Sequence, residues 1–442
     1  MVFNKLFAKK NELKLTKDEI AELLRTTPEA LEEFEAAYQK ATLDFHETSL
    51  NPMDTSVQDI KTTHAGSENE IAEKIVNDLL SGKEPTILPA DVKELPTECR
   101  PQLTAGFYTV QCDPHPSAMI LMTYKMMLDA KTEQGKQHAY HMFRQGLDIL
   151  DLDPLIYEML GRNVNSMGYW FPKLKESVDS QEFFKVPKTK ILKVPMEILQ
   201  LSRLDYELLT PITLKIVDDY CMKAFDLDVS KTYFVKTGTY SSKFNFHNAM
   251  VTGEKEVREL GEYLLFLSNQ AVIMAGPLVK PCIYGMSTTN EWVVREYIED
   301  VENNPCIYNG MPLHTEYRVF ADFDTDEILG VSPYWRPDVM LKRFGENSDP
   351  NSPHDKHDYV IYKMHEPVLM DRYEKNVEKV LENMQQIVRD TDLMGQWSID
   401  VMQNGNDFYI IDMATACTSA LSDCVPAGKI KKQEENWLPE LK

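Results

Sequence analysis

The chain of 442 residues is long enough for two or three domains, and its 43% hydrophobic and 26% charged residues are typical of a globular protein. Its 47 basic and 70 acidic side chains leave a net charge of −23, which argues against general binding to nucleic acid or to an anionic membrane but allows a locally basic cleft. No apolar run approaches the ~18 residues that a membrane-spanning helix needs, so no membrane partner is expected.

The first 200 residues predict helices and carry little recognisable chemistry. Residues 1–95 are expected to form a polar helical region, in which Thr16 and Glu19 have the spacing of a capping box. We interpret this region as a packing or docking module. Residues 96–200 form a mixed linker region, where His138 and His141 lie three apart without a third metal ligand. Two ordinary histidines are therefore expected there rather than a metal site.

From residue 200 onward, helices and strands alternate. A helix is expected over 210–225, and the strand "TYFVK" follows it. The later elements, in chain order, are a helix over 254–270, a strand over 291–299, a hairpin of 315–323 and 327–335, a polar loop over 345–358, a long helix with an apolar stripe (Tyr373, Val377, Val380, Met384, Ile387), and a second hairpin of 396–402 and 407–413.

A lysine and a hydroxyl-rich loop end the strand "TYFVK". Lys236 closes the apolar run, and the loop continues as Thr237, Gly238, Thr239, Tyr240, Ser241, Ser242 and Lys243. One interpretation is a solvated turn. The other is a polyphosphate site, because a lysine beside a Gly/Ser/Thr loop supplies positive charge and flexible hydrogen-bond donors.

Two aspartates of the last hairpin, Asp400 and Asp412, are candidate ligands of a magnesium ion. With a two-residue turn at Asn404 and Gly405, these aspartates would project from opposite faces of the ribbon. A three- or five-residue loop centred on Asn406 would instead place the carboxylates opposite each other, where their repulsion calls for a cation. The metal hypothesis thus predicts the odd-numbered loop.

The order of these motifs resembles the ATP-grasp superfamily. The motifs are the lysine with its loop, "REYIE", "EYRVF", the long helix and the two aspartate strands. The chain is most similar to the divergent clade named for two arginines and one lysine, to which the eukaryotic cell-division-cycle proteins that help assemble a translation initiation factor are related. The resemblance covers residues 200–428.

The resemblance implies an α+β fold, with a C-terminal two-lobed ATP-grasp domain behind a helical N-terminal region. The implied divisions are a helical region 1–95, a linker or pre-grasp domain 96–200, an ATP-grasp domain 201–428 and a tail 429–442. Within the ATP-grasp domain, a lid lobe would cover about 201–297 and a metal-binding lobe about 298–428.

The resemblance also implies a role for each motif, with ATP and Mg²⁺ as ligands. Lys236 would contact the phosphates, and the loop would close over them through Thr237, Gly238, Ser241, Ser242 and Lys243. Backbone groups of a hinge would read the adenine edge at Glu296, Tyr297 and Ile298. The two arginines, Arg295 and Arg318, would face phosphate or an acyl phosphate as catalytic residues. Asp400 and Asp412 would bind the magnesium.

One position departs from the family pattern of an acidic residue, any residue and Asn. Here Met413 and Ala414 follow Asp412, so a methyl group replaces an amide ligand of the second magnesium position. Thr415 or water would have to take its place. A second phosphate-facing lysine is left open among Lys188, Lys190, Lys193, Lys215 and Lys280.

The leading function is an ATP- and magnesium-dependent carboxylate–amine or carboxylate–thiol ligase. Its substrate would be a carboxylate-bearing small molecule, peptide or protein, activated as an acyl phosphate. The alternative is a non-catalytic ATP-binding protein that docks or assembles a partner protein. A third interpretation is phosphoryl or nucleotidyl transfer to a protein.

Other candidate chemistry is weaker. The cluster "HDKHD" at 354–358 could line a substrate entrance, but its polar surroundings favour a solvated loop. The seven cysteines are scattered without a CxxC pair and have no evident histidine partner. They predict reduced thiols and a cytoplasmic protein.

Overall fold

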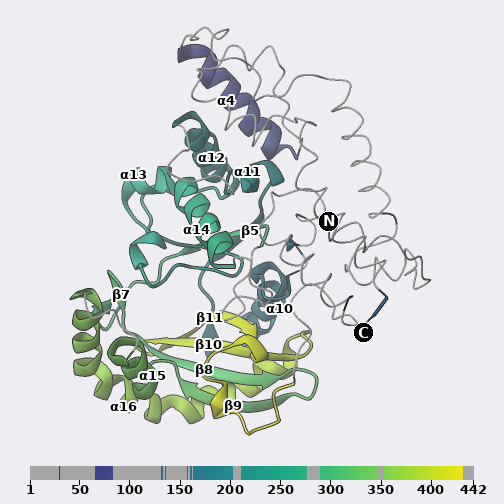
Figure 1. Ribbon diagram of the computed structural model, residues 1–442. Helices are drawn as coiled ribbons and strands as arrows, with labels where there is room; N and C mark the ends of the chain where they lie inside the picture. The colour runs from purple at the N-terminus through teal and green to yellow at the C-terminus, as the bar shows by residue number, and fades with distance from the viewer. Residues whose placement is uncertain are drawn as a thin grey trace, which may run out of the picture.

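The computed structural model describes residues 65–82, 163–202, 211–275, 289–346 and 353–431, together with the single positions 29, 131, 132, 135, 157, 160 and 161. This part of the chain forms two lobes, each built on one β-sheet, which lie one above the other in Figure 1. The predicted α+β fold class is confirmed. The predictions for His138, His141, Lys280 and most of residues 1–95 lie outside the described residues.

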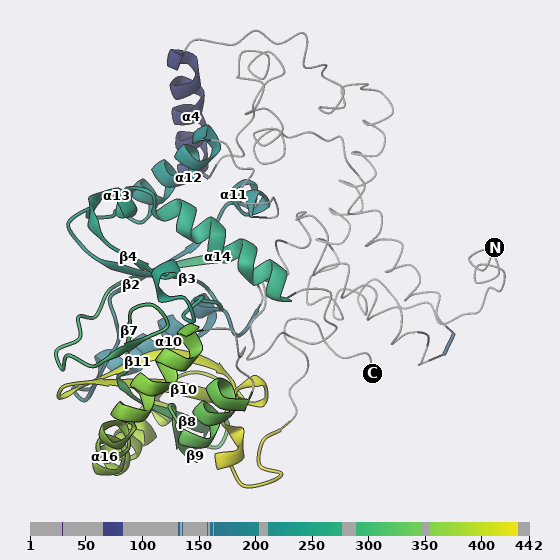
Figure 2. The ribbon, with the colours of Figure 1, turned by 60° about the vertical axis from the view of Figure 1, so that its left-hand side comes forward.

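The first lobe contains an antiparallel sheet in the order β2-β5-β3-β4. Its strands are β2 (Thr189–Lys193), β3 (Tyr233–Thr237), β4 (Met250–Val251) and β5 (Glu291–Glu296). Its helices are α11 (Met196–Leu201), α12 (Pro211–Ala224), α13 (Gly253–Arg258) and α14 (Leu260–Ala275), with the short turn η5 (Phe246–Asn248). The helix α4 (Ala65–Leu80) packs on α12 at the far end of this lobe (Figure 2).

The predicted helix over 254–270 is divided in two. α13 ends at Arg258, and Glu259 leaves the helical conformation with φ −97° and ψ 16° before α14 begins. The second helix then continues to Ala275. The prediction of helix was right for most of these residues, but the change of direction is not encoded in their apolar spacing.

The second lobe contains the sheet β1-β11-β10-β8-β9, in which only the β1–β11 pair is parallel. Its strands are β1 (Phe184–Lys185), β8 (Thr315–Asp322), β9 (Glu327–Pro333), β10 (Gln396–Asn404) and β11 (Asp407–Thr415). The helices are α10 (Met167–Asp179), α15 (Pro337–Leu341) and α16 (Pro353–Asp390). Smaller elements are β6 (Cys306–Ile307), β7 (Met311–Pro312), the π-helical turn η7 (Lys342–Glu346), η8 (Ala416–Thr418) and η9 (Ser422–Cys424).

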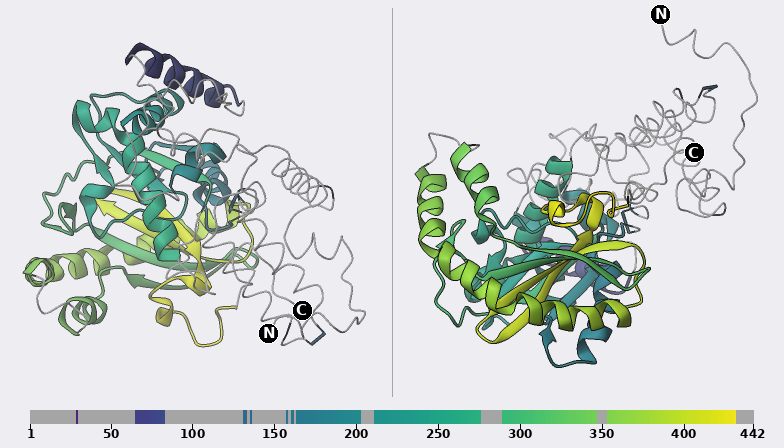
Figure 3. Two further views of the ribbon diagram at one scale, coloured as in Figure 1. Left: turned by 45° about the horizontal axis from the view of Figure 1, so that its top comes forward. Right: turned by 90° about the horizontal axis from the view of Figure 1, so that it is seen from below.

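A continuous hydrophobic core joins this sheet to its helices. The long helix α16 crosses one face of the sheet, as the view from below shows (Figure 3), and packs against β8 and β9. The predicted apolar stripe of α16 faces this core. Trp170 of α10 and Trp397 of β10 are fully buried in the same cluster, so α10 covers the sheet together with α16.

Several elements that precede residue 201 belong to the lobes, among them β1, β2 and α10. β1 extends the sheet of the second lobe, whereas β2 extends that of the first lobe, so the chain crosses between them within a few residues. The helix α10 packs on β1, β2 and β5. The two lobes are therefore assembled with residues from before the expected start of the ATP-grasp domain.

The cluster "HDKHD" is helical, so the prediction of a solvated loop over 354–358 was wrong. α16 begins at Pro353, and proline is favoured in the first turn of a helix because its missing N–H has no intrahelical role there. Asp358 accepts a hydrogen bond from the backbone N–H of Tyr308 at 2.8 Å. This contact ties α16 to the β6–β7 hairpin.

None of the described helices has the length and apolar character needed to cross a membrane.

Candidate functional site

Asp400 and Asp412 lie directly opposite each other on β10 and β11, as the metal hypothesis predicts. The predicted odd-numbered loop, however, is wrong. Asn404 pairs with Asp407, so the turn has two residues, and a β-bulge between the turn and the aspartates supplies the extra residue. That residue is Ile411, which is left without a partner on β10. The bulge restores the register that brings both carboxylates to one face.

Cationic side chains of the protein neutralise both carboxylates. Arg318 of β8 lies beside Asp400 in the sheet, and its Nε and Nη2 donate to the two carboxylate oxygens at 2.7 Å each. Lys236 of β3 comes from the opposite lobe, and its Nζ is 3.0 Å from both oxygens of Asp412. The repulsion between the carboxylates is thus met by an arginine and a lysine, and it does not by itself require a metal ion.

Lys236 is almost entirely buried, with 1% of its surface exposed, whereas the side chain of Asp412 is 42% exposed. Burial lowers the pKa of Lys236, and Asp412 opposes this shift. Burial would raise the pKa of Asp412, but Lys236 and Arg295 outweigh it and hold this pKa below its usual value. The ammonium group of Lys236 is therefore buried, whereas the carboxylate of Asp412 is partly exposed.

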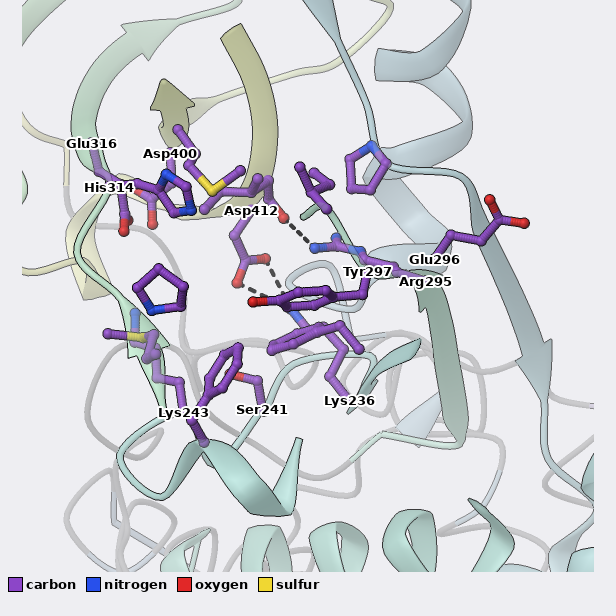
Figure 4. Close-up of a pocket in the computed structure, with 18 of the residues that line it drawn as sticks. Lys236, Ser241, Lys243, Arg295, Glu296, Tyr297, His314, Glu316, Asp400 and Asp412 are labelled. Atoms are coloured by element: carbon purple, nitrogen blue, oxygen red, sulfur yellow. Dashed lines mark hydrogen bonds and ion pairs between the residues drawn. The ribbon is translucent and has the colours of Figure 1, made fainter. Parts of the chain in front are cut away.

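Arg295 of β5 binds the backbone at the bulge and forms no ion pair with a carboxylate of the described residues. Its Nη1 donates to the carbonyl oxygen of Ile411 at 2.6 Å, and its Nη2 lies 3.0 Å from the sulfur of Met167. Burial lowers the pKa of Arg295 to about 10, and Asp412 opposes the shift. Arg295 lies near Asp412 in the first cleft, where its positive charge acts on that carboxylate (Figure 4).

Two clefts meet at these residues. The first lies between the lobes and has a volume of about 910 Å³, and the second has a volume of about 1140 Å³, in both cases counting space that is open to solvent. Both are lined by the same five residues, Ser241, Lys243, Trp335, Asp400 and Asp412. The first cleft also contains Lys236 and Arg295, and the second contains Arg318. The structure therefore brings the predicted lysine, arginines and aspartates together.

The predicted hinge borders the first cleft, but most of its polar groups are engaged. The backbone N–H groups of Glu296 and Tyr297 donate to Lys188 and Thr232 at 2.9 and 3.0 Å. The carboxylate of Glu296 points away from the site and pairs with lysines outside the cleft (Figure 4). In the described part of the chain, the N–H of Ile298 makes no hydrogen bond. Ile298 lines this cleft and therefore retains an unpaired backbone donor.

The walls of the first cleft near the hinge are mainly aromatic and apolar. They consist of Phe234, Phe246, Tyr297, Met311 and Met402. Such a pocket beside a free backbone donor suits a flat heteroaromatic ring.

The loop after β3 divides into a fixed base and a part that faces the clefts. Thr237 Oγ1 accepts from the N–H of Tyr240 at 2.9 Å, and the N–H of Gly238 donates to the carbonyl of Glu291 at 2.9 Å. A Cβ on Gly238 would lie 2.1 Å from Ser166 Oγ, so only glycine fits this packing. Thr237 and Gly238 line neither cleft. The predicted members Ser241, Ser242 and Lys243 do.

Lys243 is the second lysine of the clefts, whereas the described candidates Lys188, Lys190, Lys193 and Lys215 line neither of them. Lys243 Nζ contacts the hydroxyl of Tyr334 and lies 4.5 Å from the centre of its ring. Burial lowers the pKa of Lys243, but Tyr334 and Glu316 outweigh it and hold this pKa above its usual value.

Glu316 is a third carboxylate of the first cleft and carries no predicted role. Burial raises its pKa to about 7, Lys243 lowers it, and Asp400 adds to the rise. Its position two residues before Arg318 on β8 puts both side chains on one face of a strand, so sequence periodicity could have found it. Tyr334 and Trp335 offered no comparable signal, because they follow the end of β9.

The cleft residues fit a magnesium ion. Three carboxylates, Glu316, Asp400 and Asp412, line one cleft, and carboxylate oxygens are the ligands that magnesium prefers. Ala414 borders the second cleft but offers no side-chain ligand, and Thr415 Oγ1 is turned to Thr418 at 2.8 Å. The predicted replacement by Thr415 is therefore not supported.

Asp300, Glu302 and His314, of which His314 lines the first cleft, have ligand atoms within 4.8 Å of one another. Its carboxylates already bind other groups, because Asp300 accepts from the backbone N–H of Asn304 at 2.5 Å and Glu302 pairs with Arg372 at 3.2 Å. These contacts brace the loop after β5. The cluster is explained without an ion.

No protein-family model and no curated protein matches the sequence. Among solved structures, C-terminally truncated Cdc123 from Schizosaccharomyces pombe is similar over 64% of this chain and 96% of its own, with 13% identity and a TM-score of 0.34. An N5-carboxyaminoimidazole synthetase from Staphylococcus aureus, complexed with ADP, is similar over 57% of this chain and 44% of its own, with 9% identity and a TM-score of 0.26. D-alanyl-alanine synthetase A from Vibrio cholerae is similar over 59% of this chain and 57% of its own, with 14% identity and a TM-score of 0.25.

Proposed function

We propose that this chain binds Mg-ATP in the first cleft and uses it to activate a carboxylate held in the second, as a carboxylate–amine or carboxylate–thiol ligase. One observation carries the proposal. The two clefts meet at a cluster in which Arg318, Asp400 and Asp412 lie side by side on three strands and Lys236 approaches from the other lobe. A reaction between two ligands needs such a shared end, with charges that can balance a phosphoryl group in transit.

The first cleft suits the nucleoside end of ATP near the hinge. Its aromatic and methionine walls would cover both faces of adenine, and the free N–H of Ile298 would donate to a ring nitrogen. The phosphates would then extend toward Lys236 and Lys243 at the shared end of the clefts. Buried ammonium groups bind phosphate more strongly than exposed ones because less water competes with them.

The ion pairs of the structure keep these buried charges balanced before the nucleotide binds. Lys236 and Arg318 would exchange their carboxylates for phosphate oxygens, since both side chains reach the shared end of the clefts. Asp400 and Asp412, with Glu316 beside them, would hold the magnesium. Bound there, magnesium would offset the negative charge of the phosphates.

The proposed reaction has two steps. A carboxylate oxygen of the acceptor forms a bond to the γ-phosphorus of ATP, the bond to the β–γ bridging oxygen breaks, and ADP leaves. The amine or thiol then attacks the acyl carbon and phosphate leaves. Arg318 and Lys243 would stabilise the charge that develops on the transferred group, which is the main source of catalysis in phosphoryl transfer.

Calorimetric titration with Mg-ATP tests the nucleotide site. Lys236→Met removes the buried ammonium but keeps an apolar stem, and Lys188→Met, on an exposed ion pair, serves as the control. We expect Lys236→Met to weaken binding roughly ten- to a hundredfold, because a hydrogen bond to a charged group is worth about 1.5–3 kcal/mol. Equal affinity of the two variants, both shown to be folded by circular dichroism, would refute the site.

Turnover separates the ligase from the alternative of an ATP-binding assembly protein. With a carboxylate and hydroxylamine as the amine, a ligase would release ADP and phosphate in equal amounts and form a hydroxamate. Tight binding of Mg-ATP without this release would favour the assembly protein.

A further inference from the structure

Asn165 places a polar group without a hydrogen-bond partner at the second cleft. The residue lies in the segment before α10, is 4% exposed and lines this cleft. Its Oδ1 accepts a hydrogen bond from the backbone N–H of Thr415 at 2.7 Å. Its Nδ2 is buried and has no partner among the described residues. A buried donor that is left unpaired costs free energy, so such atoms usually mark a missing ligand or water.

The orientation of the amide is fixed by its neighbour. The N–H of Thr415 can only donate, so the atom of Asn165 that faces it must be the oxygen. The NH₂ group is therefore the atom of Asn165 that has no partner among the described residues. Asn165 is held in this position, because its own N–H donates to Asn163 and its carbonyl accepts from Trp170.

The nearby hydroxyl groups do not compete for this role. Ser398 Oγ lies 3.3 Å from the carbonyl oxygen of Ala414, and Ser419 Oγ lies 2.9 Å from that of Thr415. The two hydroxyl oxygens are also 2.6 Å apart, so one of them donates to the other. Both hydroxyl groups therefore have hydrogen-bond partners within the protein. Asn165 supplies the free donor at this part of the cleft.

A cation without an acidic partner lines the same cleft. Arg343 packs its guanidinium over Phe244 at 3.9 Å and over Tyr308 at 5.2 Å, and it makes no ion pair in the described part of the chain. The other two cations of the cleft are engaged, since Arg318 binds Asp400 and Lys243 contacts Tyr334. An arginine held by rings keeps its charge available for an anion.

From these two groups we propose that the second cleft binds an acceptor with two carboxylates, such as an acidic amino acid or an acidic peptide end. Asn165 Nδ2 donates to one carboxylate and holds it toward the shared residues Lys243 and Asp400. Arg343 pairs with the second carboxylate. The inference rests on the proposed function in so far as the first carboxylate is the one that ATP activates, and it names the class of that acceptor.

Calorimetry with simple diacids tests the assignment. The probes are the straight-chain dicarboxylates from malonate to suberate, aspartate and glutamate, each titrated with and without magnesium and a non-hydrolysable ATP analogue. The matched monoamides serve as ligand controls. We expect at least one diacid to bind and its monoamide to bind roughly tenfold more weakly. A protein that binds none of the diacids overturns the proposal.

Two variants assign the contacts. Asn165→Asp keeps the oxygen for Thr415 but replaces the donor with a negative charge, and Arg343→Gln removes the cation from an exposed side chain. Each is expected to weaken the bound diacid at least roughly tenfold. The controls Asn383→Asp and Lys342→Gln, which make the same changes outside the cleft, are expected to leave affinity unchanged. Wild-type affinity in Arg343→Gln, or in folded Asn165→Asp, overturns the corresponding contact and with it the two-carboxylate assignment.

The nucleotide titration keeps the two proposals apart. If the ATP analogue fails to bind but a diacid still binds through Asn165 and Arg343, the proposed ligase fails and the acceptor site stands. If the analogue binds and no diacid does, the ligase proposal survives and the acceptor class is wrong.

Discussion

Arg318 and Asp400 form a buried ion pair at the centre of the site. Their side chains are 12% and 9% exposed, and two parallel hydrogen bonds join them. A buried pair of this kind adds little net stability, because removing both charges from water costs about as much as their attraction returns. Its consequence is electrostatic, since the guanidinium of Arg318 gives the carboxylate of Asp400 an oppositely charged partner beside the cleft.

Breaking this pair from one side is expected to destabilise the protein more than removing both charges. Arg318→Gln leaves Asp400 buried without its hydrogen-bonded ion-pair partner, which costs about 3–5 kcal/mol. The double variant Arg318→Gln/Asp400→Asn leaves no charge and should recover much of this loss. Thermal unfolding at pH 7 checks the order of the midpoints. A double variant that melts below Arg318→Gln would show that the carboxylate has a structural partner other than the arginine.

The contact between helices α12 and α14 contains a buried carboxyl group that no cation accompanies in the described structure. Asp218 of α12 accepts from the backbone N–H of Glu262 at 3.0 Å, in the first turn of α14. A Cβ on Gly261 would lie 2.8 Å from the backbone nitrogen of Asp218, so the helices can approach only at a glycine. Burial, with the charge of Glu262, raises the pKa of Asp218 to about 8.

This raised pKa predicts a pH-dependent stability of the α12–α14 contact. Between pH 4 and pH 8 folded Asp218 keeps a proton that the unfolded chain, with the usual pKa of 3.8, has lost. Stability due to this group therefore falls as pH rises, by about 1.4 kcal/mol per pH unit. Asp218→Asn has no such proton, so its stability relative to that of the wild type should increase from pH 4 to pH 8. Unfolding midpoints across this range test it, with Asp219→Asn as control; a constant difference would contradict the assignment.

Sequence periodicity predicted the elements of the site better than their contacts. The strands β3, β5, β8, β10 and β11 follow from alternating apolar residues, and Lys236, Arg318 and the two aspartates lie on them as expected. The bulge at Ile411 does not follow from its own residues, because it depends on a hydrogen bond from Arg295 of another sheet.

The sequence also did not reveal that the segment before α10 contributes to the site. Asn165 reaches the second cleft from residues that carry no motif, and it is held there by a bond to Thr415, 250 positions later in the chain. Ser166 and Gly168 meet Glu291 of β5 in the same way. Contacts between distant segments are set by the assembled fold, so a linear motif cannot reveal them.

At the scale of the whole molecule, a strongly acidic protein surrounds a cleft of mixed charge. The chain has 47 basic and 70 acidic side chains. The cleft-lining residues, by contrast, include five cations (Lys236, Lys243, Arg295, Arg318, Arg343) and three carboxylates that face the clefts (Glu316, Asp400, Asp412). An anionic ligand is thus repelled at long range and bound by short contacts once it enters.

This separation of long-range and short-range charge predicts how salt affects the binding of Mg-ATP. Raising the salt concentration from 0.1 to 1 M shortens the screening length from about 10 Å to about 3 Å, which removes most of the long-range repulsion. The association rate should therefore rise several-fold. The dissociation rate should change less, because the contacts with Lys236 and Lys243 are buried and poorly screened. Stopped-flow mixing with a fluorescent ATP analogue measures both rates, and the corresponding uncharged nucleoside should show no salt effect. An association rate that falls with salt would mean that the cationic cleft, and not the net charge of the chain, governs the approach of the ligand.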